Sequence, residues 1–99
     1  MDDIDSLRQR IDELDRQLVR LLSERARCAL AIGRLKEQAG VPIYQPAREA
    51  EVLEHVSQAN DGPLDNEAMV RLFERIIDEA RRLERMAAAP DRTRTGRER

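Results

Sequence analysis

Four charged residues of this sequence stand in or beside positions where the helical pattern calls for apolar side chains. Arg25 interrupts an apolar series, and Lys36 returns to the same helix face about three turns later. Arg48 lies one turn before Val52 on a second apolar stripe, and Glu84 continues a third stripe. Because an unpaired buried charge costs several kcal/mol, such groups must be paired, hydrated or ready for a ligand. Three cations and one acid around a common cavity indicate a pocket for a small polyanion.

Each of these residues also has an ordinary structural explanation. In that explanation Arg25 snorkels to solvent, Lys36 caps the end of a helix, and Arg48 and Glu49 belong to the surface. Glu84 then stands on a fraying last turn. One such residue alone favours the structural explanation, whereas four of them together favour the pocket.

The single cysteine, Cys28, and the single histidine, His55, offer no ligand spacing for a metal. We therefore predict no metal site, and we expect Cys28 to be a small buried hydrophobe. One cysteine cannot form an internal disulfide, and the sequence shows neither a signal peptide nor a membrane-spanning run, so we expect a cytoplasmic protein.

The composition predicts one all-α domain. Of the 99 residues, 40% are hydrophobic, 38% are charged and only 2% are aromatic, a mixture that suits solvent-exposed helices better than strands. The net charge of −2 provides no basic field for nucleic acid or for an anionic membrane. Any anion that this protein binds must therefore be small and held locally.

One long helix is expected to position most of these charges. Apolar residues recur in steps of three and four, which predicts a helix over residues 4–39 that Gly40 and Pro42 end. Gly33 costs only about 1 kcal/mol relative to Ala and does not end it. Such a helix is about 50 Å long, whereas a compact chain of this size is about 35 Å across. Half of the helix therefore has no cover in its own chain.

Two shorter helices complete the predicted domain, residues 1–88. One helix runs over residues 46–59, and the other follows its N-cap Asp65 and ends near residue 88. For residues 89–99, which are rich in arginine, we predict a disordered tail without a function of its own.

Arg8 cannot reach the pocket of its own chain. It lies about 25 Å before Arg25 on the same helix and some 100° around the axis. If two long helices pair antiparallel across a two-fold axis, the N-terminal end of one helix brings Arg8 to the middle of the other. The same arrangement covers the surplus length of the helix.

The residues that carry these features resemble a known family, the all-helical chorismate mutases of the AroQ class. Three segments carry the likeness, in this order: LRQRIDELDRQLVRLLSERARCALAIGRLK, YQPAREAEVL and NDGPLDNEAMVRLFERIIDEARRLE. The amino-acid sequence of these segments is most similar to the mutase module that precedes prephenate dehydratase in bifunctional proteins, although these 99 residues leave no room for a second enzyme. The family implies a three-helix protomer in an intertwined antiparallel homodimer with two active sites.

The resemblance implies that the protein converts chorismate to prephenate, a step of phenylalanine and tyrosine biosynthesis that needs no cofactor. Arg25 and the partner's Arg8 would hold the two carboxylates, and Lys36 would reach one carboxylate and the ether oxygen. The cations would hold the compact diaxial substrate, and donors at the ether oxygen stabilise the negative charge that develops there.

The family implies further contacts around the rest of the substrate. Arg48 would add positive potential at the enolpyruvyl end, Glu49 would accept the ring hydroxyl, and Glu84 would face the ether oxygen. Gln45 and Ala80 stand where the family often has an acidic residue and a serine, so the contacts on the hydroxyl side differ here.

Two other interpretations remain open. An isochorismate pyruvate lyase or an aminodeoxychorismate mutase would use the same fold and similar cations. A non-catalytic helical dimerisation module is a different class, and it predicts ordinary apolar residues where Arg25 and Arg48 stand. The loop with Tyr44 and the segment PARE favour the ordinary mutase.

Overall fold

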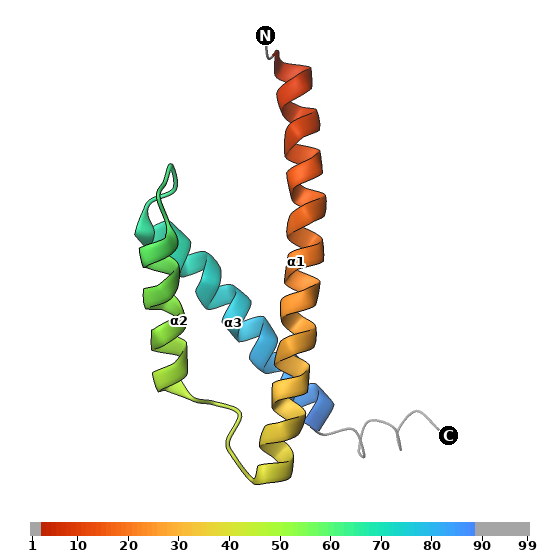
Figure 1. The fold of residues 1–99 in the computed structure, drawn as a ribbon, viewed down its shortest axis with the longest axis vertical. Coiled ribbons are helices and arrows are strands. Elements are labelled where there is room, and N and C mark those ends of the chain that lie inside the picture. The colour runs from red at the N-terminus through yellow and green to blue at the C-terminus, as the bar shows by residue number, and fades with distance from the viewer. Residues whose placement is uncertain (1–2, 89–99) are drawn as a thin grey trace, which may run out of the picture.

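A computed structural model describes residues 3–88 as three helices in the order α1 (Ile4–Ala39), α2 (Pro46–Ala59) and α3 (Asn66–Ala88). α1 forms a long rod, while α2 and α3 form a hairpin whose second helix crosses α1 (Figure 1). The predicted all-α class and the three-helix protomer are confirmed. None of these three helices carries an apolar stretch that is long enough to span a bilayer. The predicted disordered tail lies outside the described residues.

Local hydrogen bonds explain where the helices begin and end. The Asp3 carboxylate accepts the amide of Ser6 at 2.8 Å, and this bond lowers the pKa of Asp3. At the other end of α1, Gly40 adopts a left-handed conformation with φ 72°, which costs glycine little. The predicted N-cap of α3 is confirmed, because the Asp65 carboxylate accepts the amide of Ala68 at 2.8 Å.

A single chain of this fold has almost no interior. α3 packs against both α1 and α2, yet no residue of 3–88 is buried. The apolar stripe of α1 is open to solvent, with exposed fractions of 66% at Ile4, 54% at Leu18 and 60% at Leu21. The radius of gyration is 17.7 Å, whereas a compact chain of 100 residues has about 13 Å. The N-terminal half of α1 extends beyond the other two helices, as predicted from its length (Figure 1).

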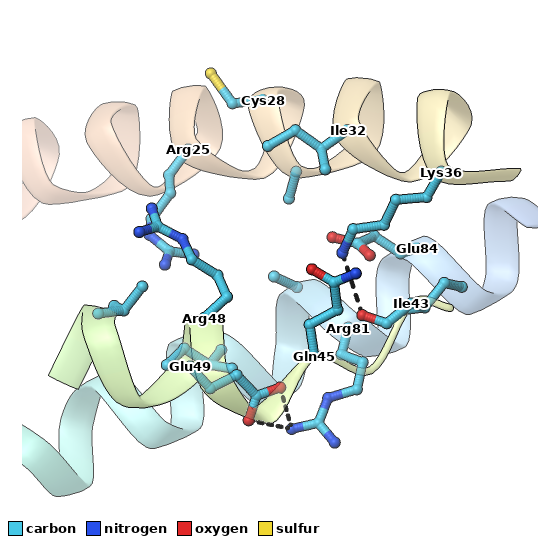
Figure 2. A pocket seen from close by; sticks show the side chains of 14 residues that line it. Arg25, Cys28, Ile32, Lys36, Ile43, Gln45, Arg48, Glu49, Arg81 and Glu84 are labelled. Carbon is cyan, nitrogen blue, oxygen red and sulfur yellow. Dashed lines mark hydrogen bonds and ion pairs between the residues drawn. The ribbon is translucent and has the colours of Figure 1, made fainter. Parts of the chain in front are cut away.

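The prediction for Cys28 was wrong for the single chain, because this thiol is exposed. Cys28 lies on α1, and its side chain points away from the charged groups of the site (Figure 2). The helical spacing correctly placed it next to an apolar stripe, but nothing in the described part of the chain covers that side of α1.

Candidate active site

A cavity of ≈ 260 Å³ lies between the C-terminal half of α1, the loop of residues 40–45, the start of α2 and the end of α3 (Figure 2). Ile32, Val52 and Ile77 supply apolar walls, and polar groups enter from all three helices. The volume lies just below the range of about 300–1,000 Å³ of small-molecule sites. Seven of the eight predicted site residues line the cavity: Arg25, Lys36, Gln45, Arg48, Glu49, Ala80 and Glu84.

Three cations face this cavity from two helices. Arg25 and Arg48 stand at one end, and Lys36 stands with Glu84 at the other (Figure 2). Lys36 Nζ donates to the carbonyl oxygen of Ile43 at 3.2 Å and so ties the loop to α1. Within residues 3–88, neither Arg25 nor Lys36 forms an ion pair, and Arg48 pairs only with Glu51, where both side chains are exposed to solvent. Both ends of the cavity can therefore attract anionic groups.

Glu84 of α3 packs closely against Gly33 of α1. A methyl group added at Gly33 would stand 3.1 Å from Glu84 Cγ and 3.4 Å from Glu84 Cβ. Only glycine leaves this space free, so Gly33 allows the acid to reach the cavity. This explains a residue that the sequence alone presents only as a weak point of the helix.

We expect the Gly33→Ala variant to fold as well as the wild type but to lose about tenfold in kcat. The better helix propensity of alanine, about 1 kcal/mol, offsets the tighter packing, whereas the Glu84 side chain is displaced from its position. Thermal unfolding and steady-state kinetics measure the two effects. In a Glu84→Ala background the same change at Gly33 should have no further effect on kcat. A wild-type kcat in Gly33→Ala would show that the close approach does not serve the site.

Arg81 is a site residue that the sequence interpretation missed. It lines the cavity, and its Nη2 donates to both Glu49 oxygens, at 3.1 Å to Oε2 and 3.3 Å to Oε1. The helical period contained the signal, since residue 81 follows Ile77 by four positions and precedes Glu84 by three. It was overlooked because it belongs to a run of charged residues that resembles a solvated face.

Gln45 and Ala80 are the two predicted residues of the cavity lining that carry no charge. Gln45 precedes α2 and makes no side-chain capping bond, so its amide can serve the cavity that it lines. Ala80 adds no polar atom to the wall. Gln45 and Glu49 therefore provide the polar groups on this side of the cavity.

Arg8 is the one predicted residue that does not line the cavity of its own chain. It is exposed on the N-terminal half of α1, the part that extends beyond α2 and α3 (Figure 1). Its predicted role across a dimer interface therefore depends on a second copy of the chain.

Comparison with known proteins places this geometry in a family. Residues 7–85 match the family described as chorismate mutase type II. The bifunctional chorismate mutase/prephenate dehydratase of Pseudomonas aeruginosa is 49% identical over 88 residues, which are 84% of this chain but 24% of that protein. The chain thus spans about a quarter of the length of this relative and of the similar bifunctional protein of Stutzerimonas stutzeri.

Two solved structures extend the likeness to three dimensions. The chorismate mutase of Thermus thermophilus (Form II) superposes with a TM-score of 0.81 at 40% identity, over 83% of this chain and 93% of that one. The chorismate mutase of Helicobacter pylori, solved in complex with prephenate, gives 0.79 at 33% identity, over 86% and 92% of the two chains. The match over residues 7–85, together with these likenesses, shows that the chain belongs to the chorismate mutase type II family.

Proposed function

We propose that this cavity binds chorismate and rearranges it to prephenate, in the biosynthesis of phenylalanine and tyrosine. The observation that carries the proposal is the convergence of Arg25, Lys36 and Arg48 on one small cavity with apolar walls, in a chain of the chorismate mutase type II family. The Helicobacter pylori relative, with prephenate bound, supports a ligand of this chemistry.

The reaction moves bonds within a single molecule. The ether C–O bond breaks while a new C–C bond forms, so that no atom enters or leaves. The protein must hold the flexible substrate in its compact diaxial form, which the cations achieve by fixing both carboxylates. Arg25 and Arg48 at one end of the cavity, and Lys36 at the other, suit a molecule with two anionic groups.

Negative charge develops on the ether oxygen in the transition state. Lys36 would donate to this oxygen, and a donor that acts there stabilises the transition state more than the bound substrate. Glu84 stands at the same end of the cavity (Figure 2). An ionised carboxylate would repel the developing charge, so Glu84 assists only when it is protonated and donates its hydrogen.

We expect Glu84→Gln to keep the activity, because the amide of glutamine has a similar shape and donates a hydrogen bond from the same position. Glu84→Ala, which leaves no donor there, should lose about 10²-fold in kcat. Steady-state kinetics of the three proteins under one set of conditions measures the effect, and equal kcat values for the Gln and Ala variants would contradict this role.

We also propose an intertwined antiparallel homodimer in which the partner's Arg8 completes each site. The exposed apolar stripe on the N-terminal half of α1 requires a cover that the described part of the chain does not supply. A hollow of ≈ 420 Å³ that includes Arg25 offers a further surface for a partner helix: its apolar lining contains Leu22, Ala26, Ile76 and Leu83, and Arg75, Glu79 and Arg82 line it as well. The cytoplasmic location remains a prediction from the sequence.

The substrate can be assigned by offering three related compounds to the purified protein. Chorismate, isochorismate and aminodeoxychorismate differ mainly on the ring, which we expect to lie beside Gln45 and Glu49 of the cavity lining. The proposal predicts the highest kcat/KM with chorismate. A higher value with isochorismate, together with the release of pyruvate, would assign the lyase instead. No conversion of any of the three would favour the dimerisation module.

A further inference from the structure

We propose that Arg81 is a positioning residue, which fixes the Glu49 carboxylate and neutralises its charge so that the cavity can accept a dianion with a ring hydroxyl. This inference rests on the proposed mutase function and deepens it. Arg81 belongs to α3, whereas Glu49 belongs to α2, so the pair joins two elements of the wall. Figure 2 shows the guanidinium reaching the Glu49 carboxylate on the side opposite Arg25 and Lys36.

The contacts of Arg81 fix its guanidinium from three directions. Nη2 donates to Glu49 at 3.1 Å and to Asp78 Oδ1 at 3.0 Å. The guanidinium carbon lies 4.9 Å from the ring centre of Tyr44, within the range of a cation–π contact. Tyr44 belongs to the loop between α1 and α2. One side chain of α3 therefore holds both the loop and the first turn of α2.

Among the ion pairs between side chains of residues 3–88, only this one has both partners shielded from solvent. The side chains of Arg81 and Glu49 are 20% and 26% exposed, whereas those of Arg48 and Glu51 are 69% and 70% exposed. Water screens a shielded pair less, so its geometry and charge matter more. Arg81 Nε is buried and has no hydrogen-bond partner within residues 3–88, so the contacts of Nη2 and the ring of Tyr44 define the position of the group.

The charge balance of the cavity explains why such a pair is useful. A lone carboxylate at Glu49 would repel a substrate that carries two negative charges of its own. Arg81 offsets the charge of Glu49, while the oxygens of Glu49 keep lone pairs that can accept a hydrogen bond from a hydroxyl. Asp78 shares the same Nη2, but its side chain is 64% exposed, so water screens its charge. The positive charge of Arg25, Lys36 and Arg48 then remains available for the carboxylates of the substrate.

Arg81→Met tests this inference, with Arg85→Met as the matched control. Arg85 lies one turn after Arg81 on α3, is exposed, lines neither the cavity nor the hollow beside Arg25, and forms no ion pair within residues 3–88. We expect Arg81→Met to raise KM for chorismate about tenfold with little change in kcat, because repulsion by Glu49 weakens ground state and transition state alike. Arg85→Met should behave as the wild type. Equal KM values in the two variants would overturn the proposal.

A double variant separates a role through Glu49 from general damage to the fold. Glu49→Gln removes the charge that Arg81 neutralises, so adding Arg81→Met to it should raise KM less than about twofold further. If Arg81→Met raises KM by the same factor in the Glu49→Gln background as in the wild type, the two residues act independently and the proposal is overturned. If Arg81→Met does not fold, Arg81→Lys replaces it. Lysine keeps the charge but cannot stack as a plane, so we expect KM to rise about threefold, and a wild-type KM would contradict the role of the guanidinium.

A second readout does not depend on turnover. The chain contains one tyrosine and no tryptophan, so tyrosine fluorescence and near-UV circular dichroism report Tyr44 directly. Arg81→Met should change the Tyr44 signal, and Arg85→Met should not. If the wild-type protein has no mutase activity but Arg81→Met still changes the Tyr44 signal, the proposed function is rejected while the contact between Arg81 and Tyr44 is supported. An active wild type whose Arg81→Met variant has an unchanged KM would reject the positioning role alone.

Discussion

Arg8→Ala and Arg25→Ala are each expected to be almost inactive, and yet a mixture of the two, unfolded and refolded together, should regain activity. In a mixed dimer one site carries both substitutions, and the other site carries neither. Random pairing gives half mixed dimers, so about a quarter of the wild-type activity should return. The reason is geometric, because Arg8 lies on the exposed end of α1, far from the cavity that Arg25 lines in the same chain.

The control for this experiment is a mixture of Arg25→Ala with Lys36→Ala. Both residues line the cavity of their own chain, so every mixed dimer has one substitution in each site and should stay inactive. Sedimentation of each protein at assay concentration checks that dimers form. Recovery in neither mixture would mean that Arg8 does not act across the interface, and a compact, active monomer would refute the intertwined arrangement.

Lys36→Ala should lower kcat far more than it weakens the binding of substrate. Lys36 is half-buried, and its ammonium group donates to the carbonyl of Ile43 at 3.2 Å, which is part of the cavity lining. A donor that acts on a developing oxyanion contributes about 3–4 kcal/mol, so the loss in kcat is expected to be roughly 10²–10³-fold.

Steady-state kinetics of Lys36→Ala measures the split between kcat and KM, and Arg34→Ala, on the exposed side of the same helix turn, is the control. A change in KM alone would make Lys36 a clamp for a carboxylate without a part in the chemistry. Because Lys36 also ties the loop at Ile43, the Tyr44 fluorescence should be compared in the same variants. An unchanged fluorescence shows that the loop has kept its place.

The sequence predicted the helices well because their signals are local. The heptad spacing, the glycine at position 40 and the N-cap Asp65 each act within a few residues, and the structure has α1 and α3 accordingly. The inward charges could also be found, since Arg25 and Lys36 break an apolar pattern that is visible in one dimension. The convergence of seven predicted side chains on one cavity follows from that pattern and from the resemblance to the family.

Features that depend on contacts between distant segments could not be predicted in the same way. Arg81 meets Glu49 across 32 positions, and Gly33 meets Glu84 where two helices cross. The packing of α3 against α2 sets the first contact and its packing against α1 sets the second, and helical periodicity carries no information about either. Cys28 was misjudged for a related reason, because burial depends on what packs against a face as well as on the face itself.

The most direct test of the account is the incubation of the purified protein with chorismate, followed in time by NMR. We expect chorismate to disappear while prephenate appears in a one-to-one ratio, with no added cofactor and no other product, and Arg25→Ala to abolish the conversion. Chorismate that stays unchanged beyond its slow uncatalysed rearrangement, or equal conversion by the Arg25→Ala protein, would contradict the assignment of this cavity as a mutase active site.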